Sequence, residues 1–368
     1  MRKTRLFGAL VALALLVAAC GGAGESGDGG GDAGGASEGG GGAAASEGGG
    51  AAAELSLPQV QLAIDNDDFM NQLGWMVADE DYWPDLGFTQ PAEVVATDEY
   101  LAGLVGGSVW VAQGESDAIW AALAEGSVPM KMIGVEKDTE AWFLGIREGV
   151  DAENLEGLRI SGGPVGDRNI TVGEHILNEM GVDPESMEWV PVEGGSDERL
   201  QALLAGQLDA AVLQPRHLIP LDEGGGEMIF QEYRDSPQEM WVVTAETMEN
   251  NRDAVCAYLE GRIAAKQWLS EGEDYMDNQE AGVAIARERG LDPSEGDLDE
   301  WQAEMEGNWS LDGGSPAESF DAWNEDMIAN GNVPEGFDFR DHIDFSCLWE
   351  VQEKLGLEQN PVESELGL

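Results

Sequence analysis

The sequence predicts an α/β protein made of two similar lobes. Between residues 57 and 213, segments with helical spacing alternate with short apolar segments, which favours strands covered by helices. The order helix, glycine, strand, polar loop occurs at residues 101–113 and again at residues 200–214. The stretch from residue 54 to residue 368 is longer than one typical domain, so we expect these two halves to form separate lobes.

The first 19 residues have the features of an export signal. Three basic residues among the first five precede the apolar residues 6–18, which are too few to span a bilayer. Val17-Ala18-Ala19-Cys20 resembles the lipobox of bacterial lipoproteins, in which the cysteine is acylated and becomes the first mature residue. We therefore expect residues 1–19 to be a lipoprotein signal peptide and Cys20 to be lipidated. The alternative is an ordinary signal peptide with an incidental cysteine.

Residues 20–53 are expected to connect this anchor to the folded part. After Cys20 they are almost entirely Gly, Ala, Ser, Glu and Asp, and such a segment has no apolar surface to bury. A flexible chain of this length reaches about 30 Å. The sequence thus predicts a folded protein held on a membrane by a flexible tether.

Charge excludes nucleic acid as a partner. The full chain has a net charge of −55, and the signal segment carries three basic residues and no acid, so the remainder has −58. Phosphate binding needs a basic face, which this composition does not offer. Twelve tryptophans argue against disorder, and abundant acid with scarce lysine is typical of a surface adapted to high salt.

The two cysteines that follow the tether are Cys256 and Cys347. In an exported protein such a pair is more often bridged than free, so we expect a disulfide, with two separate buried thiols as the alternative.

Hydrophobic spacing and glycine positions predict the elements in order. Strands are expected at 57–64, 92–97, 108–112, 129–135, 141–147, 158–161, 188–192, 208–213 and 227–231, and an apolar segment follows at 240–244. Helices are expected at 69–80, 98–105, 117–125, 168–180 and 197–205, and the chain is mostly helical from residue 246 onward.

Residues 155–214 resemble the second lobe of solute-binding proteins that serve ABC importers. The resemblance rests on L-x-G-x-x-I at 155–160, the glycine loop 162–167, M-G-V-D-P-E at 180–185 and A-L-L-A-G-Q-L-D-A at 202–210. It is greatest to the branch that binds nitrate, alkanesulfonates, taurine and pyrimidine precursors of thiamine. Gly163-Pro164 and Gln214 depart from the pattern of that branch, where a hydroxyl residue and an aromatic residue are common.

The resemblance implies a type II periplasmic-binding-protein-like fold. Its chain crosses a hinge twice, here near 141–148 and 236–243, and a ligand cleft lies between the lobes. Lobe 1 would comprise residues 54–143 plus 244–368, and lobe 2 residues 144–243. The implied function is to capture a small organic solute outside the cytoplasm and deliver it to an ABC importer permease. The protein would be a monomer without a cofactor, lipid-anchored at the outer face of the cytoplasmic membrane.

Ligands of open α/β sheets lie beyond the carboxyl ends of strands, next to helix N-termini. The loops there supply Asp65, Asn66, Asp67, Gln113, Gly114, Glu115, Ser116, Gly162, Gly163, Asp167, Arg168, Asn169, Glu193, Gln214 and Arg216 as expected solute contacts. Trp142 and Trp241, beside the hinge strands, are expected to stack on a flat solute, or else to be core residues.

Each of these residues also has a structural interpretation. Ser116 and Asp167 suit helix N-caps, Asp65 and Asp67 suit an acidic surface, and Arg168 and Arg216 suit ion pairs. Helix N-termini and the arginines favour a sulfonate or carboxylate, whereas the acids and tryptophans favour an amine or a pyrimidine-like ring.

An enzyme is the main alternative, and a surface sensor or structural lipoprotein is another. The three histidines are scattered, and no G-x-S-x-G, H-E-x-x-H or C-x-x-C motif occurs. Residues 65–70 (DNDDFM) resemble the start of an EF-hand, but Met70 replaces the required glycine, so no metal site is expected.

Overall fold

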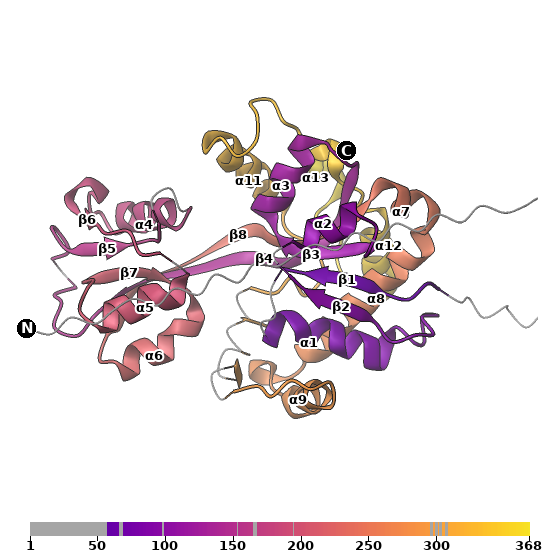
Figure 1. Ribbon diagram of the computed structural model, residues 1–368, viewed down its shortest axis with the longest axis horizontal. Helices are drawn as coiled ribbons and strands as arrows, with labels where there is room; N and C mark the ends of the chain where they lie inside the picture. Colours follow the sequence, from indigo (N-terminus) through magenta and orange to yellow (C-terminus); the bar gives the residue numbers. More distant parts are fainter. Residues whose placement is uncertain are drawn as a thin grey trace, which may run out of the picture. The chain divides into compact units, whose positions relative to one another are not determined.

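The structure is a computed structural model that describes residues 57–65, 69–97, 99–152, 154–164, 168–193, 195–294, 297–298, 301, 304–305 and 308–368. The predicted signal peptide and tether lie outside the described residues. Eight strands form one sheet in the order β2-β1-β3-β8-β4-β7-β5-β6 (Figure 1). The α/β class is therefore confirmed.

One end of the sheet is built from the N-terminal part of the chain. Strands β1 (Gln61–Ile64), β2 (Glu93–Ala96) and β3 (Val111–Glu115) pair in parallel. They alternate with α1 (Phe69–Val77), a π-helical turn (Ala78–Tyr82), α2 (Tyr100–Val105) and α3 (Ser116–Glu125). Gly126, with φ +64°, ends α3 in the left-handed conformation that a glycine adopts without strain.

The other end of the sheet repeats this arrangement. Strands β5 (Arg159–Ser161), β6 (Glu188–Trp189) and β7 (Ala210–Leu213) again pair in parallel with one another, and β7 pairs antiparallel with the long strand β4 (Met130–Ile146). The helices here are α4 (Arg168–Glu179), α5 (Ser196–Leu204) and α6 (Leu218–Glu223). The similarity of residues 101–113 and 200–214 thus corresponds to two equivalent strand connections, α2 to β3 and α5 to β7.

Two long antiparallel strands, β4 (Met130–Ile146) and β8 (Glu227–Thr244), join the halves (Figure 1). The sequence analysis expected two strands, 129–135 and 141–147, where the structure has β4 alone, and it expected a strand only at 227–231 where the structure has the longer β8. Both strands continue through the polar residues near 136–140 and 232–239 with register shifts. Lys137 on β4 pairs with Glu239 on β8 at 2.8 Å, so the polar residues bond to each other across the ladder.

The apolar core is divided in the same way as the sheet. One cluster combines residues from 57–135 with residues from 240–366, and two smaller clusters lie within 142–230. Trp142 and Phe143 belong to the smaller clusters, whereas Met240 and Trp241 belong to the large one. The proposed limits of the lobes, 54–143 plus 244–368 and 144–243, stay a prediction.

The C-terminal third is helical, as expected. It contains α7 (Ala245–Asn250), α8 (Arg252–Leu269), α9 (Gln279–Glu288), α11 (Ala317–Ala329), α12 (Ser346–Leu355) and α13 (Glu363–Leu366). The expected disulfide is present and joins Cys256 on α8 to Cys347 on α12. Among the described residues, no helix has the length and apolarity needed to cross a membrane.

Candidate functional site

A pocket of about 300 Å³ lies where residues of both halves meet. It is lined by Glu115, Asp117, Trp142, Asn169, Gly195, Ser196, Arg199, Gln214, Arg216 and Gln238. These residues come from the carboxyl ends of β3 and β7, from the first turns of α3, α4 and α5, and from the two long strands. The position agrees with the rule for ligand sites in α/β sheets.

The wall of the pocket formed by Glu115 and Asp117 is acidic, and Glu115 belongs to a cluster with two further carboxylates that do not line the pocket. Carboxylate oxygens of Asp65, Glu115 and Glu239 lie within 4.8 Å of one another. Asp65 accepts a hydrogen bond from the backbone N–H of Glu115 at 3.1 Å, which holds the end of β3 against the end of β1. Desolvation and the neighbouring Glu239 and Asp65 raise the pKa of the Glu115 carboxyl well above its usual value, although its side chain is open to the pocket.

Lys137 is the cation next to this wall. It pairs with Glu239 at 2.8 Å, and Glu304 lies 3.9 Å from its ammonium. Burial opposes the charge on Lys137, but the two glutamates outweigh burial and raise its pKa. The lysine therefore stays charged and is occupied by Glu239, on the β8 side of the cluster.

Two arginines also line the pocket. Arg199 on α5 is 1% exposed, and its Nε donates to the carbonyl oxygen of Val212 at 2.9 Å. Arg216 donates to Ser196 Oγ at 2.9 Å, and Ser196 in turn donates to Gln214 Oε1 at 3.1 Å. These bonds fix two guanidinium groups at the start of α5, where an anion is favoured.

His217 supports this wall from behind. Its Nδ1 accepts a hydrogen bond from the backbone N–H of Gln214 at 3.2 Å, and its Nε2 lies 2.6 Å from a carboxylate oxygen of Asp197. Nδ1 is thus an acceptor and Nε2 the donor, which is the pattern of a neutral imidazole. Burial lowers the pKa of His217, and its hydrogen bond lowers the pKa of Asp197.

Two buried polar atoms in the pocket wall have no hydrogen-bond partner. They are Nε1 of Trp142, a donor, and Oε1 of Gln238, an acceptor. Their side chains are 8% and 9% exposed. Most buried polar groups in proteins are hydrogen-bonded, so a ligand that accepts from one and donates to the other would satisfy both.

Of the expected site residues, Glu115, Trp142, Asn169, Gln214 and Arg216 line the pocket. Gln113, Ser116 and Trp241 are fully buried instead. Gln113 donates to Glu239 and accepts from Trp241, each at 3.4 Å. Ser116 donates to the carbonyl oxygens of Pro237 and Gln238. These side chains support the pocket from behind rather than lining it.

The glycines have a steric function that the sequence prediction did not separate from ligand contact. A Cβ on Gly114 would lie 2.5 Å from the Tyr100 ring, and one on Gly162 would lie 2.5 Å from the Asn169 carbonyl oxygen. Gly163 has φ +125°, a backbone conformation that residues with a side chain rarely adopt. Close packing of strand ends on helix starts therefore requires these glycines.

The remaining expected residues fall elsewhere. Glu193 is exposed and does not line the pocket, and Arg168 begins α4. Asn66, Asp67, Asp167 and the side chain of Arg168 lie outside the described residues.

The sequence prediction missed Asp117, Gly195, Ser196, Arg199 and Gln238. Asp117 and Arg199 lie in the expected helices 117–125 and 197–205, of which no residue was nominated, whereas Gly195 and Ser196 directly precede the expected helix 197–205 and were not nominated. Arg199 could have been found by its type, since Lys and Arg together number 18 against 73 Asp and Glu. Gln238 lies in the part of β8 beyond the expected strand 227–231.

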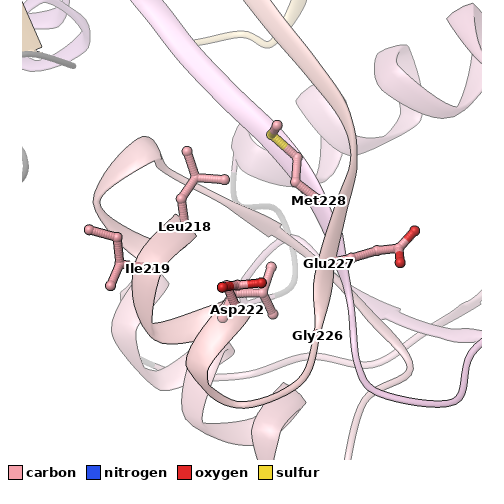
Figure 2. Close-up of a pocket in the computed structure, with 7 residues that line it drawn as sticks. Leu218, Ile219, Asp222, Gly226, Glu227 and Met228 are labelled. Atoms are coloured by element: carbon pink, nitrogen blue, oxygen red, sulfur yellow. The ribbon is translucent and has the colours of Figure 1, made fainter.

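A second pocket, of about 370 Å³, lies on α6 and the beginning of β8. Figure 2 shows Leu218, Ile219 and Met228 around it and Glu227 pointing away from the helix. Its lining contains no basic residue, and it collects no strand ends. The pocket between β3 and α5 is therefore the candidate functional site.

No protein-family profile matches the chain, and no curated protein matches it. Solved structures do. The periplasmic sulfonate-binding protein SsuA from Methylobacillus flagellatus matches with a TM-score of 0.64 and 13% identity, over 83% of this chain and 96% of that one. The alkanesulfonate-binding protein SsuA from Xanthomonas axonopodis, bound to MOPS, matches with a TM-score of 0.54 and 14% identity, over 79% and 99%.

An enzyme with the same fold matches as well. The desulfurization enzyme DSZB, in complex with biphenyl-2-sulfinic acid, has a TM-score of 0.58 and 12% identity, over 81% of this chain and 100% of that one. The chain therefore has the periplasmic-binding-protein fold that its sequence predicted. The fold by itself does not distinguish binding from catalysis.

Proposed function

We propose that this chain is a solute-binding protein that captures a small organic solute in the pocket between β3 and α5 and delivers it to an ABC importer permease. The proposal rests on which residues line this pocket and on their hydrogen bonding. Residues from both halves of the sheet converge there, and Trp142 Nε1 and Gln238 Oε1 are left without partners. A solute that contacts both halves would favour a closed arrangement of the lobes.

The hydrogen bonds around the pocket favour binding over catalysis. Ser196 donates to Gln214 and accepts from Arg216, so its hydroxyl proton is not held by a base. His217 lies outside the lining and is bonded to Asp197 and to the backbone of Gln214. Cys256 and Cys347 are bonded to each other. An enzyme acting on a small molecule in the same pocket is the second candidate, because DSZB has this fold.

The location follows from the segments that precede the fold. We propose export, acylation of Cys20 and attachment to the outer face of the cytoplasmic membrane through the tether at residues 20–53. This attachment would keep the protein concentrated near its permease. Replacing Cys20 by alanine should move the protein from the membrane fraction to the soluble fraction; a Cys20→Ala variant that stays with the membrane would contradict the anchor.

The binding function is tested by native mass spectrometry of the purified chain, followed by calorimetry and small-angle scattering with the solute that copurifies. We expect one solute per chain, recovered unchanged, and a more compact particle when it is bound. Arg216→Gln should weaken binding, whereas Arg287→Gln, an exposed arginine on α9 outside the pocket, should not. Chemical conversion of the solute would favour the enzyme.

A further inference from the structure

A small cavity of about 30 Å³ lies beside the candidate solute pocket. The cavity and the pocket share Gln214, Arg216 and Gln238. The cavity is otherwise lined by Lys137, Ala141, Pro215, Glu304 and Asn308. Arg216 follows β7 in one half of the sheet, whereas Glu304 and Asn308 come from a C-terminal segment that packs in the core cluster of the other half. A cavity of this size has room for one or two water molecules but not for a solute, so it marks a contact between the two halves.

The C-terminal side of this cavity offers two oxygen atoms without a donor. Within the described part of the chain, Glu304 Oε2 and Asn308 Oδ1 are buried and have no hydrogen-bond partner. The Asn308 amide is held in this orientation because its Nδ2 donates to Glu304 Oε1 at 2.8 Å. Lys137 lies 3.9 Å from Glu304 Oε2, but it is bound by Glu239 at 2.8 Å. Buried acceptors are normally satisfied, so we expect these two atoms to receive a donor in another arrangement of the protein.

Arg216 is the lining residue that can supply this donor, because its guanidinium has five N–H groups. In the structure it donates to Ser196 Oγ at 2.9 Å and lies 3.7 Å from a carboxylate oxygen of Asp197. The Asp197 side chain is 65% exposed, and the same oxygen lies 2.6 Å from Nε2 of His217. An ion pair with an exposed carboxylate contributes little stability, so Arg216 is able to exchange this partner for another.

We infer that Arg216 is the movable part of a latch between the two halves of the protein, and that Glu304 and Asn308 are its receptor. In the latched position Arg216 turns from Asp197 into the small cavity and donates to Glu304 Oε2 and Asn308 Oδ1. Glu304 is already buried with one oxygen unsatisfied, so part of the desolvation cost of this pair is present before the pair forms. The solute-free chain exchanges between the two positions, and a solute that contacts both halves shifts it toward the latched one. The inference rests on the proposed function, since it adds the residues that hold the solute pocket closed.

The backbone around the cavity allows the distance between the arginine and its receptor to change. The receptor segment is fixed to β4 by backbone hydrogen bonds of 2.8–3.1 Å that join residues 308–313 to residues 135–138. Arg216 instead follows β7, which pairs with β4 farther along, at residues 143–146. The register of β4 against β8 shifts between residues 137 and 139, next to the first of these attachments. Strands bend at such irregularities, so bending of β4 there would move the arginine relative to its receptor.

A double-mutant cycle tests the pair in the purified chain, dialysed to remove solute. The unfolding equilibrium is measured in urea for Arg216→Gln, Glu304→Gln and the double variant. Because each single variant removes the same pair, the product of their effects on the unfolding constant should exceed the effect of the double variant about threefold or more. Glu318→Gln, at an exposed residue of α11 outside the cavity, is the control and should show no coupling to Arg216→Gln.

The movement is tested with phenylglyoxal, a reagent that modifies accessible guanidinium groups. Peptide mass spectrometry gives the rate of modification at Arg216 relative to Arg287, whose side chain is 57% exposed. Glu304→Gln and Asn308→Ala should each make Arg216 react several times faster, because the receptor is lost, whereas Glu318→Gln should leave its rate unchanged. Arg287 should keep its rate in all variants.

Two results would overturn the inference. Additive effects in the cycle would assign the two oxygen atoms to solvent in the cavity. Coupling without faster modification of Arg216 in the variants would indicate a fixed ion pair, not a latch. Asn308→Ala keeps both charges, so it reports on the receptor even if Glu304→Gln fails to fold. None of these measurements needs a solute, so the proposed function fails separately, if no solute copurifies or if the solute is converted.

Discussion

The disulfide between Cys256 and Cys347 gives the most quantitative prediction. It joins α8 to α12 across 91 residues of chain, so its loss should mainly increase the conformational freedom of the unfolded state. For a loop of this length the chain-entropy relation gives about 4.5 kcal/mol at 25 °C. We expect the double variant Cys256→Ala/Cys347→Ala to lose a free energy of unfolding of that order, measured by urea denaturation.

The reduced parent protein is the matched control, because it keeps both sulfur atoms in place. Cys347 is fully buried, so any extra loss in the double alanine variant reports packing rather than the crosslink. The reasoning would be refuted if reduction lowered the free energy of unfolding by less than about 1 kcal/mol, since the 91-residue loop predicts several times that value.

Three further predictions follow from single residues and from charge. Asp209 accepts hydrogen bonds from Arg159 and Arg147 that lower its pKa, so Asp209→Asn should lower the free energy of unfolding by about 2–3 kcal/mol near pH 7 and by progressively less below pH 4. The control variant Glu156→Gln, at an exposed residue, should lower it little, and equal losses of the two variants in urea titrations would contradict the prediction. Burial lowers the pKa of His217, so the folded protein binds fewer protons than the unfolded chain, and the free energy of unfolding should fall as the pH drops below about 6.5. The variant His217→Gln should show a weaker pH dependence, and an unchanged slope would exclude His217 as its source. Because the chain has a net charge of −55, its like charges repel one another, and salt should weaken this repulsion. The melting temperature should therefore rise between 0.1 and 1 M NaCl, where the screening length shortens from about 10 Å to about 3 Å, and an unchanged melting temperature would contradict this.

Local patterns were sufficient to predict most of the fold. Helix α1 buries eight of its nine residues, and its apolar spacing was visible in the sequence. Gly181, which follows the expected helix 168–180 and has φ +76°, correctly marked the end of α4 to within one residue. The continuity of β4 and β8 could not be predicted in this way, because it depends on the pairing of Lys137 with Glu239, which are far apart in sequence.

The candidate site was predictable only in part for a similar reason. Strand ends indicated Glu115 and Gln214, but the fold decides which neighbouring side chains turn into the pocket and which support it from behind. Gln113 lies two residues before Glu115 and is fully buried, whereas Glu115 lines the pocket. Gly163 shows a related limit. Its φ of +125° means that a Gly163→Val variant would strain the backbone, so such a variant cannot separate loss of binding from loss of folding.

The scarcity of basic residues determines how the site should be interpreted. With 73 acids and 18 Lys and Arg, an acidic residue in a pocket carries little information by itself, but a basic one is unusual. Arg262 and Lys266 hold the buried Glu136, and Arg147 and Arg159 hold Asp209. Arg199 and Arg216 line a pocket that also contains unpartnered polar atoms, and Arg216 lies 3.7 Å from a carboxylate oxygen of Asp197. Among the charged residues that line the pocket, the two arginines are therefore more informative about its ligand than the two acids.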